Sequence, residues 1–295
     1  MKIPVSVPLY PEKMKEGSLL FYTYANKRYH PFAALYPLFA LVSNPRSIVE
    51  ICLSEPRGFV RSYSGIIDFY ANTFPGRVLY TFIDPCDIFS NSLRFLVQPQ
   101  SRAQYVYIGD VDILLLEKNI LDWHLRHIQE YNLDFSNVVR EGAEELTGLH
   151  FIEYDAMFPV QVVDEIDLRS TRDEVLLYKL MSWKGLKIPS VTDLTHRPVH
   201  GLHISFFSRP LFPTLTTGDR LAAYPTWYGQ SEETDRFVEE YLNVRYASPI
   251  VDFMRHIRDD NVKLRQLVQI VDIFCAYCRD VYCKANNARV NPIHA

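Results

Sequence analysis

Short apolar runs and helix-like segments alternate along the first two thirds of the chain. Runs rich in Val, Ile, Leu, Tyr and Phe and bounded by turn residues are typical of strands, whereas apolar residues repeated every three or four positions are typical of helices. This pattern predicts strands at 18–25, 47–54, 77–85, 103–109 and 148–158, and a strand or a strand with a loop at 199–208. It predicts helices at 30–44, 86–98 and 172–185, with Gly185 ending the last one, and a helical or irregular segment at 122–132.

The order of these elements indicates an α/β protein. Beyond residue 226 the strand patterns stop and only helical patterns continue. We therefore expect one α/β domain at 1–225 and a helical region at 226–295 that packs on it.

Composition and charge exclude several classes of protein. Apolar residues make up 48% and charged residues 22%, which is ordinary for a globular protein. The net charge of −4 does not imply a basic surface for nucleic acid. The apolar stretch at 31–42 is shorter than the roughly 20 residues that span a bilayer. Five cysteines without a framework spacing favour a reducing compartment, so we expect a cytoplasmic protein, with contact to a membrane surface left open.

The stretch YVYIGDVDILLL, at 105–116, places two carboxylates at the end of a predicted strand. In an extended segment, the side chains of Asp110 and Asp112 face the same way. Ligands of α/β proteins bind at this end of the strands, and Mg²⁺ or Mn²⁺ often shares one or two carboxylates with substrate phosphates. The pair therefore predicts a metal and diphosphate site. The alternative is that the two aspartates only cap a turn or the next helix.

Other short motifs occur in order around this pair. They are TYANKRY at 23–29, SR at 101–102, GDVD at 109–112, RDEVLLY at 172–178 and HISFFSRP at 203–210. In this order they resemble the motifs of nucleotide-sugar glycosyltransferases of the GT-A class, in particular glycosyltransferase family 8, which includes glycogenins and bacterial galactosyltransferases. The resemblance covers most of 18–215. It implies a GT-A (Rossmann-like) mixed sheet flanked by helices, with a C-terminal helical extension.

For the donor, the resemblance implies a site at the end of the first strand and beside the D-x-D strand. The residues that it assigns to nucleotide-sugar binding are Thr23, Tyr24, Asn26, Tyr29, Arg102, Asp110 and Arg209. Arg102 and Arg209 are expected to face the donor phosphates. Arg209 stands where the family has a lysine, and the usual glycine of that motif is missing.

For the metal, the resemblance implies that Asp110, Asp112 and His203 hold Mn²⁺ or Mg²⁺. His200 lies three residues before His203 and is the alternative ligand. For catalysis, it implies a carboxylate near the reacting centre, either Asp173 or Glu174, where the family has an Asp-Gln pair. Both carboxylates also suit the first turn of a helix without any catalytic role.

The implied function is a hexosyltransferase (EC 2.4) that moves a sugar, with retention, from a UDP-sugar to a glycan or lipid-linked acceptor. Surface polysaccharide or lipopolysaccharide assembly is the expected setting. Two alternatives stay open: a non-catalytic nucleotide-sugar-binding or scaffold protein with the same fold, and a sugar nucleotidyltransferase as a second class of enzyme. The nucleotidyltransferase is disfavoured because such enzymes carry a glycine-rich N-terminal loop, and only Gly17 lies near the first strand. A membrane surface and a second copy of the chain are further partners that the sequence leaves open.

Overall fold

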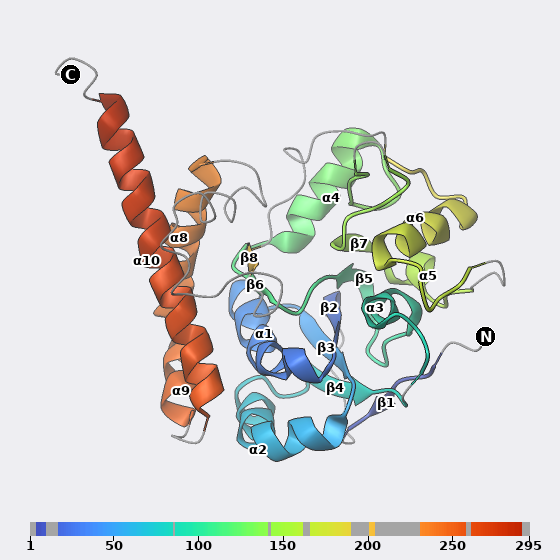
Figure 1. Cartoon of the computed structure of the whole chain (residues 1–295), viewed down its shortest axis with the longest axis horizontal. Helices are drawn as coiled ribbons and strands as arrows, with labels where there is room; N and C mark the ends of the chain where they lie inside the picture. Colours follow the sequence, from blue (N-terminus) through green and yellow to red (C-terminus); the bar gives the residue numbers. More distant parts are fainter. Residues whose placement is uncertain are drawn as a thin grey trace.

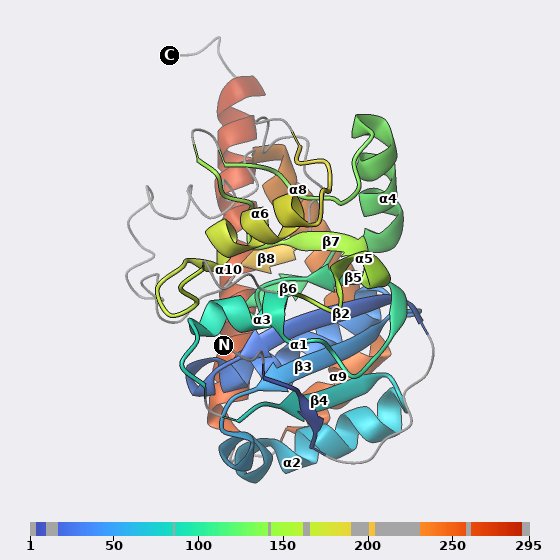
Figure 2. The same cartoon turned by 90° about the vertical axis from the view of Figure 1, so that its right-hand side faces the viewer.

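The computed structural model describes residues 4–9, 17–84, 86–140, 143–161, 166–189, 201–203, 231–257 and 261–290. At its centre lies a six-stranded sheet with the strand order β1-β4-β3-β2-β5-β7 (Figures 1 and 2). Its strands are β1 (Val7–Pro8), β2 (Gly17–Ala25), β3 (Ile48–Leu53), β4 (Val78–Phe82), β5 (Ala103–Ile108) and β7 (His150–Glu153). The four inner strands are parallel, whereas β1 and β7 run antiparallel to their neighbours. The sheet is therefore mixed.

Helices cover both faces of this sheet, which explains why its inner strands are almost wholly apolar. Leu19 and Phe21 of β2 pack in one core cluster with α1 (His30–Ser43) and α2 (Pro56–Thr73). Leu20 and Tyr22, which alternate with them, pack in a second cluster with α3 (Leu93–Leu96), α5 (Tyr154–Met157) and α6 (Asp173–Trp183). Successive side chains of a strand point to opposite faces of the sheet, so β2 contributes to a hydrophobic core on each face.

Smaller elements complete the carboxyl edge of the sheet. The 3₁₀ helix η1 (Lys27–Tyr29) follows β2, and η2 (Ser90–Ser92) leads into α3. The short strand β6 (Ile113–Leu115) follows β5 and pairs antiparallel with β8 (Gly201–His203) in a separate two-stranded sheet. Helix α4 (Ile120–Tyr131) lies beyond β6.

The C-terminal helices form a further layer outside α1. They are α8 (Ser231–Arg245), α9 (Ser248–His256) and α10 (Val262–Val290). All three contact α1, and α9 also contacts α2. Tyr241, Phe253 and Leu267 belong to the same core cluster as α1, and Figure 1 shows the three helices along its outer side. The expected fold class is confirmed: a mixed α/β sheet flanked by helices, with a C-terminal helical extension.

Two expected elements differ from the structure. The helix predicted at 86–98 is limited to η2 and the single turn of α3, since Val97 already has an extended backbone. The strand predicted at 148–158 ends at Glu153, where the chain turns into α5. Of the strand predicted at 199–208, the structure describes only β8. Among the described helices, none is both long and apolar enough to cross a membrane.

Candidate functional site

The turn after β5 fixes the position of the D-x-D motif. The Thr23 hydroxyl, at the end of the neighbouring strand β2, donates a buried hydrogen bond of 2.8 Å to the carbonyl oxygen of Gly109. Gly109 fits where a larger residue does not, because a Cβ there would lie 2.7 Å from the Tyr107 ring. Asp110 follows directly, so its carboxylate lies at the carboxyl edge of two central parallel strands. Ligands of open α/β sheets bind at this edge.

A buried arginine of α3 joins two carboxylates at this edge. Arg94, only 6% exposed, forms an ion pair through Nη1 with Oδ1 of Asp110. Its Nη2 donates a hydrogen bond of 2.7 Å to Oδ2 of Asp173, the first residue of α6. Burial alone lowers the pKa of the Arg94 guanidinium, but the two carboxylates outweigh burial and raise it. Arg94 therefore stays charged and holds two acidic groups from distant segments side by side.

Gly148 allows the backbone to pass close to this group. A Cβ at position 148 would lie 2.7 Å from Nη2 of Arg94 and 3.4 Å from Oδ2 of Asp110. The neighbouring residue Thr147 is fixed by Asn137, whose Oδ1 accepts from the Thr147 amide at 3.1 Å and hydroxyl at 2.6 Å. Asn137 also donates to the Thr147 carbonyl oxygen at 3.0 Å. The segment before β7 thus forms a fixed wall against Arg94 and Asp110.

Glu174 lies beside this group but has another partner. Its half-buried carboxylate forms an ion pair with Arg140. Burial raises the pKa of Glu174, and Arg140 opposes that rise. The backbone carbonyl of Glu174 also accepts from the Leu146 amide at 3.2 Å. Of the two candidate catalytic carboxylates, Asp173 therefore contacts the Arg94 group, whereas Glu174 ties α6 to the segment before β7.

The residues expected to hold a metal are described only in part. Asp112 is buried, with 4% of its surface exposed. The register of the small sheet pairs Ile113 with His203, which places the backbone of His203 beside the residue that follows Asp112. Two carboxylates and an imidazole are donors that Mn²⁺ accepts, so the residue types fit a divalent cation. Among the side chains that the structure describes, no group of three metal-binding residues is assembled. His200 and Arg209 lie outside the described residues.

Arg102 is not brought to the Arg94 group. It precedes β5, whereas Asp110 follows it, and a six-residue strand is about 20 Å long. The Arg102 side chain is 72% exposed and contacts both carboxylate oxygens of Asp155, at 2.6 and 2.9 Å. The basic residue found beside Asp110 is Arg94, which the sequence analysis missed. Its only signal is a single charge inside the apolar stretch LRFLV at 93–97.

The other candidate donor-binding residues lie at the end of β2. This end is level with Asp110, since the register pairs Tyr22 with Ile108. Tyr24 is half-buried, and burial raises the pKa of its hydroxyl to about 12. The Asn26 side chain caps η1 by accepting from the Arg28 amide at 3.0 Å. Tyr29 is half-buried, with its ring 5.8 Å from that of Phe32. The segment 23–29 is therefore held rigidly at the same edge of the sheet.

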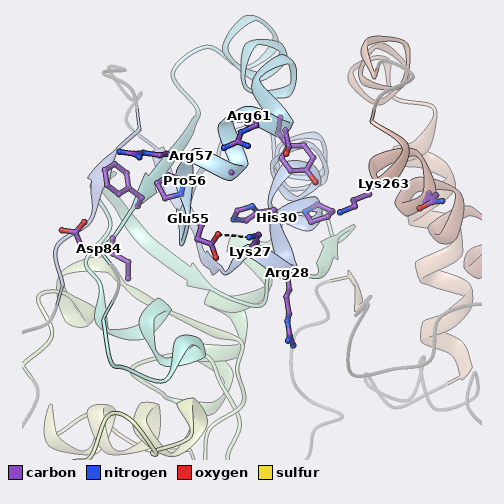
Figure 3. Close-up of a pocket in the computed structure, with 16 residues that line it drawn as sticks. Lys27, Arg28, His30, Glu55, Pro56, Arg57, Arg61, Asp84 and Lys263 are labelled. Carbon is purple, nitrogen blue, oxygen red and sulfur yellow. Dashed lines mark ion pairs between the residues drawn. The ribbon is translucent and has the colours of Figure 1, made fainter.

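A cavity of about 1120 Å³ opens at the carboxyl ends of β2, β3 and β4 (Figure 3). Its walls come from residues 27–31, the start of α2, the end of β4 and two residues of α10. Five basic side chains line it: Lys27, Arg28, Arg57, Arg61 and Lys263. Two acidic side chains, Glu55 and Asp84, also line it, which leaves a formal charge of +3 in a chain whose net charge is −4. The cavity leaves no pattern in the sequence, because its residues come from four separate segments.

No protein-family model and no curated protein matches the chain. Solved structures with partial similarity include the glycosyltransferase GlyE of Streptococcus pneumoniae TIGR4, at 10% identity and a TM-score of 0.36 over 48% of this chain and 35% of GlyE. S. aureus TarS 1-349 is similar at 12% identity and a TM-score of 0.42, over 78% of this chain and 72% of that one. The mannosyltransferase PcManGT of Pyrobaculum calidifontis is similar at 9% identity and a TM-score of 0.43, over 96% and 83%. The chain thus spans about a third of the length of GlyE. At these identities and TM-scores, the similarities do not show the activity of this chain.

Proposed function

We propose that the chain is a metal-dependent glycosyltransferase of the GT-A class, related to family 8. Its catalytic domain is 1–225, and the helical region 226–295 packs on it. One observation carries the proposal: the buried guanidinium of Arg94 contacts both Asp110 and Asp173. The motif resemblance assigns these two aspartates to one reaction centre, although they are far apart in the sequence. Their common partner supports that assignment.

The donor that fits this edge of the sheet is a nucleotide diphosphate sugar, with UDP as the expected nucleotide. Thr23, Tyr24, Asn26 and Tyr29 form the nucleotide side of the site at the end of β2. Arg94 supplies positive charge beside Asp110 in the place that the sequence analysis gave to Arg102. Arg209 remains a candidate for the donor phosphates.

Asp110, Asp112 and His203 are the residues that would hold Mn²⁺ or Mg²⁺. A divalent cation there would offset the negative charge of the leaving diphosphate. Asp110 has Oδ1 paired with Arg94, and its Oδ2 faces Gly148. The position of Asp110 is thus set by the protein before any ligand binds, which is how preorganised sites lower the cost of reaction.

In the transfer, the bond between the anomeric carbon and the diphosphate oxygen breaks, and its electron pair leaves with the nucleotide. The acceptor hydroxyl oxygen bonds to the anomeric carbon and loses its proton. The sugar carries positive charge at the transition state, as in glycoside hydrolysis, and the Asp173 carboxylate is suited to face it. Glu174 positions α6 through Arg140. A retaining outcome, in which the leaving diphosphate accepts the proton, is the one that the resemblance supports.

The acceptor in this proposal is a glycan or lipid-linked hydroxyl in surface polysaccharide or lipopolysaccharide assembly, at the cytoplasmic side of a membrane. Contact with that membrane and self-association belong to the same proposal. Sugar transfer to a defined acceptor by the purified chain is the assay that tests this part.

The experiment for the donor site is isothermal titration with UDP, with and without Mn²⁺. Asp110→Asn and Asp112→Asn are compared with Asp122→Asn, an exposed aspartate of α4 outside the site. We expect Mn²⁺ to strengthen UDP binding at least tenfold, which corresponds to about 1.4 kcal/mol. This gain is expected to disappear in the two site variants and persist in Asp122→Asn.

Binding that ignores both Mn²⁺ and the two site variants would favour the nucleotide-sugar-binding scaffold. If neither UDP nor any other nucleotide or nucleotide sugar binds, the proposed function is wrong. Metal-dependent binding followed by transfer from one UDP-sugar would identify the donor.

A further inference from the structure

The basic cavity in Figure 3 carries more positive charge than its own acidic residues neutralise. Lys27 and Glu55 form an ion pair of 3.1 Å and cancel each other. Arg57, Arg61 and Lys263 have no ion-pair partner among the residues that the structure describes. Arg28, Arg57, Arg61 and Lys263 therefore line one open cavity in which Asp84 is the only other acidic side chain among the lining residues, so positive charge is in excess there. The chain as a whole has a net charge of −4, so the charge of the cavity is opposite in sign to that of the chain.

The arrangement of these cations is unfavourable without a ligand. Arg57 and Arg61 are four residues apart on α2, so they lie on the same side of the helix and repel each other. Lys263, at the start of α10, lines the same cavity from another side (Figure 3). An anion between them would relieve this repulsion.

The first turn of α2 lines the same space. No side chain caps this end of the helix, although the four leading amides of a helix need partners. Gly58 leaves the turn open, since a Cβ there would meet no atom within 4 Å. The backbone of α2 is non-helical at Tyr63, so the helical stretch at this end covers only residues 56–62. The charge of the cavity therefore comes from its side chains.

We propose that this cavity binds a phosphate-bearing anion at a site separate from the donor diphosphate site at Asp110. The forked guanidinium groups of Arg57 and Arg61 match phosphate oxygens, and Lys263 adds a third positive charge. Two sources share this chemistry: a phosphate group on the acceptor, and a free polyphosphate. The site gives the C-terminal helices a role, because α10 supplies one of the three cations.

The test is isothermal titration of the full chain with pyrophosphate in the presence of EDTA, which removes any contribution of a divalent cation. We expect binding that weakens about tenfold in Arg57→Gln/Arg61→Gln and less in Lys263→Gln, as loss of charge-assisted hydrogen bonds predicts. Arg46→Gln is the matched control, an exposed arginine before β3 that is not part of the cavity. Arg57→Lys/Arg61→Lys keeps the charge and is expected to retain most of the binding, which separates loss of the site from loss of the fold.

Asp110→Asn separates this proposal from the proposed function. It is expected to leave pyrophosphate binding in EDTA unchanged while it abolishes the Mn²⁺-dependent gain in UDP affinity. The anion site is wrong if the metal-free protein does not bind pyrophosphate, or if Arg46→Gln weakens binding as much as the double variant does. It is also wrong if Asp110→Asn removes the binding. Comparing the affinities for inorganic phosphate, glucose 6-phosphate and pyrophosphate distinguishes the two sources. If glucose 6-phosphate binds more tightly than inorganic phosphate, the result supports a phosphorylated acceptor. If pyrophosphate binds most tightly of the three, it supports a free polyphosphate.

Discussion

Arg94 donates a hydrogen bond of 2.7 Å to Asp173, and both side chains are at least nine-tenths buried. The same guanidinium contacts Asp110 at the end of β5. Among the described residues, neither carboxylate has another ion-pair partner, so both depend on this one cation. The stability of the carboxyl edge and the position of the candidate catalytic groups therefore rest on a single side chain.

Removing that cation is expected to destabilise the protein and abolish donor binding. In Arg94→Leu, two carboxylates would stay close together without a counter-ion, and breaking a buried ion pair in this way costs about 3–5 kcal/mol. Arg94→Lys keeps the charge but loses the fork, so we expect an intermediate loss of stability. Urea unfolding of the wild-type protein and both variants measures the effect. An Arg94→Leu variant as stable as the wild type would show that the contacts of Arg94 do not contribute.

Gly148→Ala tests whether the wall beside Arg94 sets the geometry of the site. The added methyl group would lie 2.7 Å from Nη2 of Arg94, so the guanidinium or the backbone must shift. Overpacking of this kind costs about 1–3 kcal/mol, and the shift of Asp110 is expected to weaken Mn²⁺-dependent UDP binding. Gly58→Ala is the control, because its Cβ has open space and the helix gains up to about 1 kcal/mol. Equal UDP affinity in both variants would contradict the role given to Gly148.

A buried histidine in β7 predicts a loss of stability in acid. His150 has no exposed surface, and burial lowers its pKa to about 3 from the ordinary 6.5. Between these values the unfolded chain binds a proton that the folded chain does not, so stability falls as the pH falls below 6.5. At pH 5 the loss is about 2 kcal/mol relative to neutral pH.

Urea unfolding at pH 7 and pH 5 measures this loss in the wild type and in His150→Gln. The variant is expected to lose about 2 kcal/mol less than the wild type between the two pH values, while other titrating groups cancel in the difference. The same acid dependence in wild type and His150→Gln would show that another group is responsible.

The parallel strands could be predicted because their local pattern and their environment agree. All six residues of β3 are buried and all except Glu50 are apolar, which is typical of a strand covered on both faces. Helix α2 was missed, although Phe59, Tyr63, Ile66 and Tyr70 are buried at helical spacing, because glycine and serine residues interrupt the pattern. Strand β6 was also missed. It is only three residues long, and its partner β8 lies far away in the sequence.

The candidate site was predicted in part for a similar reason. Asp110 and Asp173 each belong to a recognisable local motif, so the sequence could identify them. Arg94 belongs to none, and its partners lie 16 and 79 residues away. Pairing over such distances leaves no signal in a single sequence. Arg102 was chosen because the resemblance places a basic residue after a serine just before the D-x-D strand, but the length of β5 separates Arg102 from Asp110.

Arg102→Ala tests which arginine serves the donor. Its ion pair with Asp155 is exposed on both sides and contributes at most about 1 kcal/mol, so the variant is expected to be nearly as stable as the wild type. Arg102 and Asp110 lie at opposite ends of β5, so we expect the Mn²⁺-dependent affinity for UDP to be unchanged in Arg102→Ala. Titration of Arg94→Lys under the same conditions is the comparison, and a clear loss of affinity is expected there. If Arg102→Ala loses as much UDP affinity as Arg94→Lys does, Arg102 is part of the donor site. The donor would then have to extend from the carboxyl edge to the amino edge of β5, about 20 Å away.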